Sequence, residues 1–166
     1  MIPFALVTAL ALAAAPENRV HELPVGSLSV KPDTVRNAPT VEVEVMLVIE
    51  PGNVRHYRMD RKVIDRQGKV RQSAADSRTC PALMAELAKA EELPMPRFLP
   101  PGSKTSADFP VLLLHATTYT LTMQGYESGS NTDANIELRA QSGSPLAQWT
   151  DTLLTALEPC WTAPAT

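Results

Sequence analysis

Cys80 is the residue of this chain best placed to do chemistry. Pro81 follows it and Leu83 and Leu87 begin an apolar stripe, so Cys80 stands at the expected start of a helix. A thiol there is a stronger nucleophile, because the helix N-terminus favours the thiolate. Cys160 is the chain's other cysteine, and no Cys-x-x-Cys motif is present. We therefore expect a structural disulfide between Cys80 and Cys160, and the alternative is a thiol-dependent enzyme or redox protein that uses Cys80.

Histidine supplies a second, weaker set of reactive side chains. His115 shares the parity of Tyr119 on an expected strand, which places an imidazole on an apolar face. His115, His56 and Tyr119 are the candidate polar site, and a core or edge histidine is the more ordinary interpretation. With His21 as the third imidazole and no two on a common helix, we assign no metal site.

No other sequence motif identifies a catalytic or cofactor-binding residue. The chain has seven glycines, with neither a Gly-x-Ser-x-Gly motif nor a glycine-rich phosphate loop. Glu42 and Glu44 point the same way, but their valine neighbours indicate the solvated face of a strand rather than a glycosidase pair. Met46, Met59 and Met123 are typical core residues rather than copper ligands. We assign neither a catalytic residue nor a cofactor.

Residues 1–15, MIPFALVTALALAAA, carry no charged side chain and end in small residues. This run is shorter than the roughly 20 residues that cross a bilayer, so we expect a signal peptide and no membrane span in the mature chain. Cleavage after Ala13 is favoured over cleavage after Ala15, because Pro16 follows Ala15. The alternative is a buried N-terminal helix of a cytosolic protein. The leader predicts a periplasmic or secreted protein, where disulfides persist.

The charge distribution argues against a nucleic-acid partner. The 15 Lys and Arg residues are scattered among 18 acids, and the formal net charge is −3. The densest basic stretch, 55–71, is interrupted by Asp60 and Asp65, which is typical of a solvated sheet face. About 150 residues remain after the leader, enough for one hydrophobic core.

Hydrophobic periodicity predicts the elements that would position these residues. Residues 16–39 are an expected N-terminal arm, with a short strand at 25–30 that forms an arm or an edge. A single domain then spans 40–166. Its expected strands show apolar residues alternating with polar ones, or lie between turn signals at Pro51-Gly52 and Gly68. They cover 41–49, 55 onward, 69–74, 111–123 and 134–138.

Two helices complete the expected domain. One begins at Cys80-Pro81 and ends before Pro94; the other begins with Ser144 as N-cap and Pro145, and ends at Pro159. The order β-β-β-α-β-β-α predicts an α+β two-layer sandwich, an antiparallel sheet of about five strands with both helices on one face. The disulfide would join the start of the first helix to the end of the second, with the helices either antiparallel or crossed.

The segment 63–87 contains an Asp-x-x-Gly hairpin that leads through a serine-containing loop into a helix. It resembles the strand-turn-strand-helix of the TonB C-terminal family over about 25 residues. We take no function from this resemblance.

The sequence therefore predicts an exported, non-catalytic domain that binds or inhibits an envelope or extracellular protein. The exposed face of the sheet and the proline-rich segment 94–110 are the two expected binding surfaces. The alternative remains the thiol-dependent protein built on Cys80. The sequence leaves the oligomeric state open.

Overall fold

The structure is a computed structural model, and it describes residues 19–33, 38–94, 116–126 and 133–163. The expected signal peptide, His115 and all of the proline-rich segment except Pro94 lie outside the described residues.

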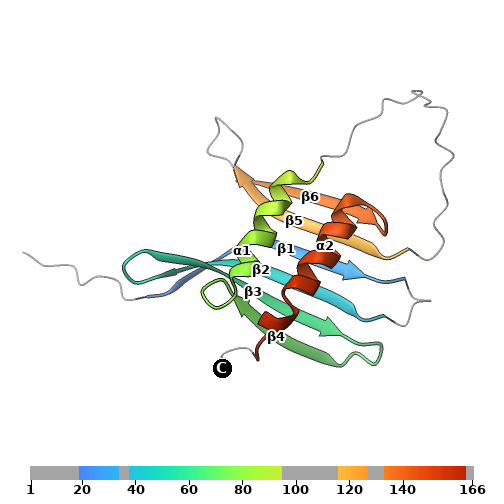
Figure 1. Cartoon of the computed structure of the whole chain (residues 1–166), viewed down its shortest axis with the longest axis horizontal. Helices are drawn as coiled ribbons and strands as arrows, with labels where there is room; N and C mark the ends of the chain where they lie inside the picture. Colours follow the sequence, from blue (N-terminus) through green and yellow to red (C-terminus); the bar gives the residue numbers. More distant parts are fainter. Residues whose placement is uncertain (1–18, 34–37, 95–115, 127–132, 164–166) are drawn as a thin grey trace, which may run out of the picture.

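Six antiparallel strands form one sheet in the order β4-β3-β2-β1-β5-β6, with two helices on one face (Figure 1). This confirms the α+β class with its antiparallel sheet, and the strand count is six rather than about five. The strands are β1 (His21–Lys31), β2 (Thr40–Glu50), β3 (Val54–Ile64), β4 (Val70–Asp76), β5 (Thr118–Tyr126) and β6 (Asp133–Gln141).

The additional strand corrects the interpretation of 16–39 as an arm or edge. β1 spans 11 residues and lies inside the sheet, paired with β2 on one side and β5 on the other. Its pairing with β2 is interrupted by a bulge between Pro24 and Gly26. Pro24 and Gly26 are residues that weaken a strand signal, so the local pattern did not indicate a central strand. Gly26 is required there, since a Cβ would lie 2.8 Å from the carbonyl oxygen of Thr122.

The turns between the first strands follow the glycine positions. Gly52 has φ 82° and the amide of Asn53 donates to the carbonyl of Glu50 at 3.0 Å, which agrees with the expected type II turn at Pro51-Gly52. Gly68 has φ 78° in the next hairpin, where its amide donates to the carbonyl of Asp65 at 3.0 Å. Both turns require a residue that tolerates positive φ.

The two helices are α1 (Pro81–Ala88), followed by the 3-10 turn η1 (Lys89–Glu92), and α2 (Pro145–Ala156), followed by η2 (Glu158–Cys160). Ser144 caps α2, its hydroxyl accepting from the amide of Ala147 at 3.1 Å. Figure 1 shows α1 and α2 antiparallel on the sheet, which decides between the two expected arrangements. Trp149 of α2 donates its indole N–H to the carbonyl of Glu86 in α1 at 3.0 Å.

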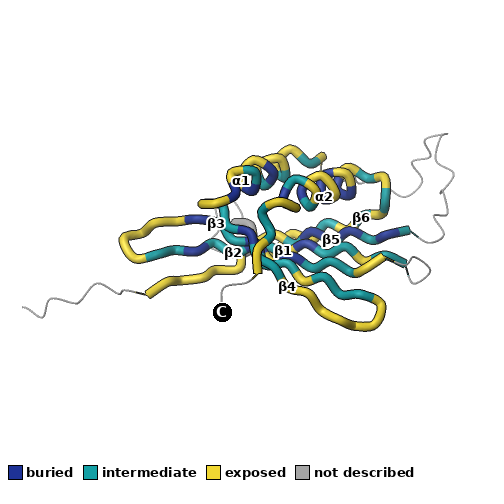
Figure 2. The backbone as a smooth tube through the Cα atoms, turned by 60° about the horizontal axis from the view of Figure 1, so that its bottom comes forward, coloured by how far each residue is buried: buried dark blue, intermediate teal, exposed yellow. Residues whose placement is uncertain are grey.

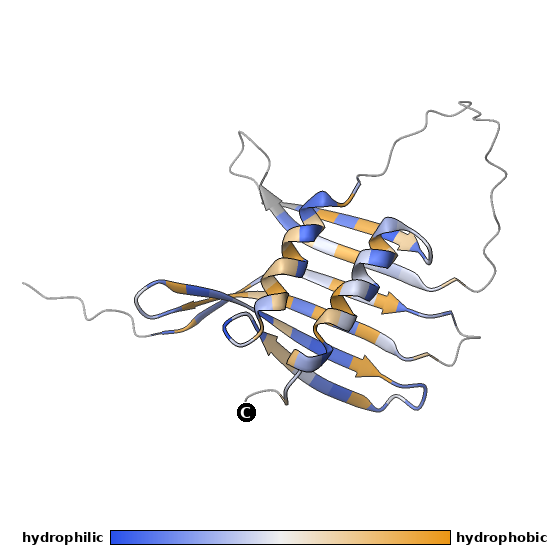
Figure 3. Ribbon diagram, viewed as in Figure 1, coloured by the Kyte–Doolittle hydropathy of each residue, from blue (hydrophilic) through white to orange (hydrophobic). Residues whose placement is uncertain are grey.

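The core lies between the helices and the sheet, where Figure 2 shows the buried positions and Figure 3 the apolar ones. Its members are buried apolar residues, which include Leu28, Val43, Val45, Met59, Leu83, Leu121, Leu146, Trp149, Leu153 and Leu157. Cys80 is also buried here and bonds to Cys160, with the two Cα atoms 5.8 Å apart. The expected disulfide is confirmed, and it joins the N-cap of α1 to η2.

The chain that follows η2 returns to the edge of the sheet. Thr162 and Ala74 of β4 exchange two backbone hydrogen bonds, each 2.9 Å long. Arg61 of β3 lies 4.3 Å from the centre of the Trp161 ring, and its guanidinium also bonds Glu158 at 3.0 Å. The β4 edge is therefore partly closed by the chain itself.

Candidate functional site

The face of the sheet turned away from the helices, here called the outer face, is the polar surface of the domain. Strand alternation places Glu42, Glu44, Asp60 and Lys62 on it, because their neighbours Val43, Val45 and Met59 lie in the core. No described helix covers the outer face, as Figure 1 shows. This agrees with the expectation of a solvated face for Glu42 and Glu44.

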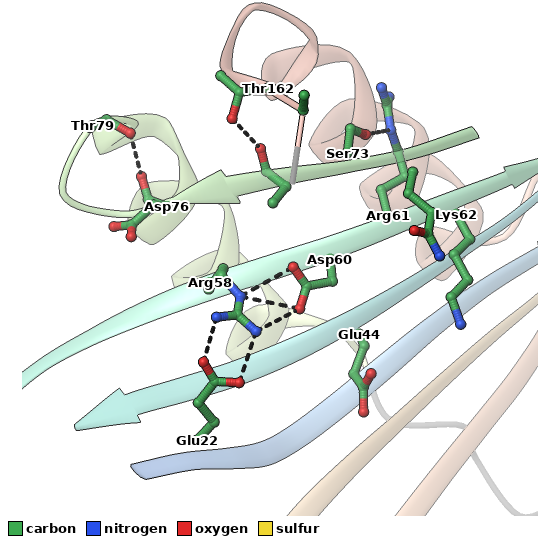
Figure 4. Close-up of a pocket in the computed structure, with 13 residues that line it drawn as sticks. Glu22, Glu44, Arg58, Asp60, Arg61, Lys62, Ser73, Asp76, Thr79 and Thr162 are labelled. Carbon is green, nitrogen blue, oxygen red and sulfur yellow. Dashed lines mark hydrogen bonds and ion pairs between the residues drawn. The ribbon is translucent and has the colours of Figure 1, made fainter. Parts of the chain in front are cut away.

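A hollow of about 580 Å³ lies on this face beside β4 (Figure 4). Its lining is charged or polar apart from two alanines. The residues are Glu22, Glu44, Arg58, Asp60, Arg61, Lys62, Gln72, Ser73, Ala74, Asp76, Thr79, Thr162 and Ala163. They come from β1, β2, β3, β4, the loop that follows β4 and the chain after η2. We call it the charged hollow.

Arg58 is the centre of the charged hollow. Its guanidinium donates to both carboxylate oxygens of Glu22, at 2.7 and 3.0 Å, and to Asp60 at 2.9 to 3.1 Å (Figure 4). The hydrogen bonds from Arg58 hold the pKa of Glu22 below its ordinary value, and the same two carboxylates raise the pKa of Arg58. All three groups are paired within the cluster, which keeps a net charge of −1, and the ion pairs connect β1 to β3.

Glu44 and Lys62 differ from that cluster. Both side chains are exposed, and neither forms an ion pair within the described part of the chain. Glu44 faces Asp60 across the β2–β3 ladder, and Lys62 faces Glu42. One anionic and one cationic group are therefore available to an external partner on the same surface.

A second, shallower hollow of about 320 Å³ shares Glu44, Asp60 and Lys62 with the charged hollow and extends over β1. Ser29 lines it, and its buried hydroxyl has no hydrogen-bond partner in the described structure. The two hollows make the outer face concave across β1, β2 and β3. A concave, mixed-charge surface with few apolar side chains differs from the mostly apolar pockets that hold small organic ligands.

No functional role was expected for Arg58, Glu44 or Lys62, because they lie in stretches whose pattern predicts a solvated sheet face. The available signal was the alternation of charged residues at even positions in both 42–44 and 58–62. That pattern predicts a charged face, but it does not show which charges neutralise one another.

His56, from the candidate polar site, is buried on β3 beside Val48 of β2. Its Nε2 lies 3.4 Å from Oδ2 of Asp76, and its Nδ1 has no partner in the described structure. Arg78 donates hydrogen bonds to the Asp76 carboxylate, and these bonds are the main reason that the pKa of Asp76 is lowered. His56 is buried, with 6 % of its surface exposed.

Tyr119 lies far from His56. Tyr119 pairs with Val30 of β1, and the same row across the sheet continues through Val41 of β2 to Val63 of β3. Val63 is seven residues away from His56 along β3. Tyr119 is in the core, and its hydroxyl donates to the Asp151 carboxylate at 3.1 Å, whereas His56 points to the other side of the sheet. The structure therefore does not bring these two residues together.

Cys80 carries no free thiol in this structure, because its sulfur is bonded to Cys160. Among the described residues, no group of three or more His, Cys, Asp or Glu side chains is arranged to hold a metal ion.

An apolar cavity of about 380 Å³ lies between α1 and the sheet. Met59 and Leu28 are buried in its lining, while Met84 and Met123 are exposed. It is continuous with the core that packs the two layers together, so we treat it as part of the helix–sheet interface.

Comparison with known proteins finds no matching family model, no matching curated protein and no matching solved structure. The resemblance of segment 63–87 to the TonB C-terminal family is accordingly not extended. Within the described ranges, no helix is both long enough and apolar enough to span a bilayer.

Proposed function

We propose that this chain is an exported, non-catalytic domain that binds or inhibits another envelope or extracellular protein through the outer face of its sheet. The observation that carries the proposal is the concave outer face, where the exposed charges of Glu44 and Lys62 have no ion-pair partner within the described residues. The paired Arg58 cluster lies beside them in the charged hollow. Exposed charges that complement those of a protein partner select it and exclude others.

Site-directed photo-crosslinking in the native cells tests the surface. A photoreactive residue at position 27, where exposed Ser27 lines the second hollow beside Glu44, is expected to give a discrete adduct. One at Glu92 on η1 is not, since Glu92 is exposed on the helical side. In the same cells, Lys62→Glu should abolish the position-27 adduct and Glu92→Lys should leave it unchanged. Adducts of equal yield from both positions, or none from the outer face, contradict the proposal.

Export is the second part of the proposal, and it rests on the uncharged leader and on a disulfide of the kind that persists outside the cytosol. Fractionation followed by N-terminal sequencing of the recovered chain tests it directly. A periplasmic or secreted protein that begins at Ala14 is expected. An intact N-terminus in the cytosolic fraction contradicts export.

The alternative function, a thiol enzyme or redox protein, requires Cys80 as a free thiolate. Thiol titration of the denatured, unreduced protein separates the two functions. No free thiol is expected for the binding domain, and two free thiols would favour the enzyme.

A further inference from the structure

The two edges of the sheet differ. Ala74 on the β4 edge is paired with Thr162, whereas within the described residues no strand pairs with the outer edge of β6. Alternate residues of an edge strand direct their backbone N–H and C=O groups away from the sheet, where they can pair with another chain. β6 contains no proline and no lysine, residues that commonly block such pairing.

The side chains of β6 divide cleanly between the two faces. Leu138 pairs with buried Leu121, so Ile136, Leu138 and Ala140 lie on the helix side. Ile136 is 46 % exposed there, although it is a large apolar residue. Glu137 and Arg139 lie on the outer face and form an ion pair along the strand at 3.0 Å.

We infer that β6 is the contact surface for a second copy of this chain, which adds its own β6 antiparallel about a two-fold axis through Leu138. In this register Leu138 faces Leu138 of the other copy, and a residue before it faces the residue that lies equally far after it. Each Glu137 then faces Arg139 of the other copy, and Ile136 faces Ala140. An antiparallel, isologous pair of this kind continues one sheet across both copies and covers the exposed Ile136 on the helix side.

The charges select this register over its neighbours. An axis through Glu137 or through Arg139 would place two identical charges directly opposite each other, which destabilises a strand pair. The adjoining outer-face positions of β5 are Thr120 and Thr122, so no charge on β5 competes for Glu137 or Arg139. The four charged side chains of the two copies therefore alternate in sign at the junction.

Charge reversal with the purified chain tests the inference by analytical ultracentrifugation. The wild-type chain is expected to dimerise reversibly. Glu137→Arg makes all four charged side chains at the junction cations and Arg139→Glu makes all four anions, so each variant alone should raise the dimer dissociation constant by about tenfold or more. Both side chains are more than half exposed, so each variant should keep the wild-type circular dichroism spectrum.

Mixing the two variants provides the decisive measurement. Glu137→Arg and Arg139→Glu chains are complementary to each other at the junction, so the mixture should form a heterodimer with near wild-type affinity. The double variant, with both residues exchanged, should dimerise like the wild type. A chain that stays monomeric up to about 1 mM, or variants whose self-association is unchanged, would overturn the inference.

Two further measurements distinguish a dimer formed through β6 from binding at the outer face and from peptide binding at the β6 edge. Lys62→Glu, on the face proposed to bind another protein, should leave dimerisation unchanged, so failure of one proposal is distinguishable from failure of the other. If the wild-type chain is monomeric but an added synthetic peptide of β6 sequence binds it, β6 receives an extended peptide rather than a second copy, and the dimer is excluded.

Discussion

The guanidinium of Arg61 lies 4.3 Å from the centre of the Trp161 ring, and this contact joins β3 to the chain after η2. The two residues are 100 positions apart in the sequence. Arg61 also donates to the hydroxyl of Ser73 at 3.0 Å, so one side chain connects the sheet, its β4 edge and the C-terminal segment. The bridge between Ala74 and Thr162 lies directly beside it.

Arg61→Ala should lower the free energy of unfolding by about 1 to 2 kcal/mol, because it removes a cation–π contact and hydrogen bonds at a partly buried site. Arg61→Lys should recover only part of this loss, since an ammonium cannot reproduce the planar contact. Urea unfolding of Arg61→Ala, Trp161→Ala and the double variant measures the coupling. Additive effects of the two substitutions would show that the contact contributes nothing.

Removal of the disulfide should have a larger effect. Replacing Cys80 and Cys160 together by alanine opens an 80-residue loop, and the expected loss is about 2 to 4 kcal/mol of unfolding free energy. Urea unfolding of the wild-type chain with and without reductant provides the comparison, and reductant should not shift the midpoint of the double alanine variant. Equal stability of all these forms would exclude a bracing role for the bond.

Gly26→Ala should destabilise the centre of the sheet. The added Cβ would lie 2.8 Å from a backbone oxygen of β5, and a backbone neighbour cannot rotate away, so β1 and β5 must separate. A loss of about 1 to 3 kcal/mol is expected from thermal or urea unfolding. Ser27→Ala is the matched control, because Ser27 is the exposed next residue of the same strand and should change stability little. Gly26→Ala as stable as the control would contradict the close approach.

The extent to which the fold follows from sequence can be traced to particular residues. Alternation at 41–49 and the Ser144-Pro145 start of α2 are local signals, and the structure confirms both. The central place of β1 is different, because it depends on β5 pairing with β1 over a separation of about 90 residues. No local pattern encodes that choice, and Pro24 and Gly26 obscured the strand itself.

The candidate site was less predictable than the fold for a similar reason. Glu42 and Glu44 were correctly placed on a solvated face, since parity alone decides this. The pairing of Arg58 with Glu22 depends on which strands are neighbours and on their register. His56 and Tyr119 were grouped by residue type, and strand alternation places them on opposite sides of the sheet.

The Arg58 cluster should make stability depend on acidity. The folded-state pKa of Glu22 lies below its ordinary value of 4.5, so the folded chain binds fewer protons than the unfolded chain when the pH is near that value. The contribution of this ion pair is therefore complete above about pH 4.5 and is lost as the pH falls through the lowered folded-state pKa of Glu22. The pKa of Asp76 is also lowered from its ordinary value of 3.8, so the loss of Asp76's ion pairs lowers stability further as the pH falls below about that value.

Arg58→Met should remove the Glu22 part of this dependence while keeping the apolar stem of the side chain. The expected result is a lower melting temperature at pH 7 and a smaller further decrease between about pH 5 and pH 3 than in the wild type. Arg55→Met is the matched control, since Arg55 is exposed on the same strand and its side chain donates to Asn53, which carries no charge. If the melting temperatures of the wild type and Arg58→Met fall equally between about pH 5 and pH 3, the cluster does not couple proton binding to folding.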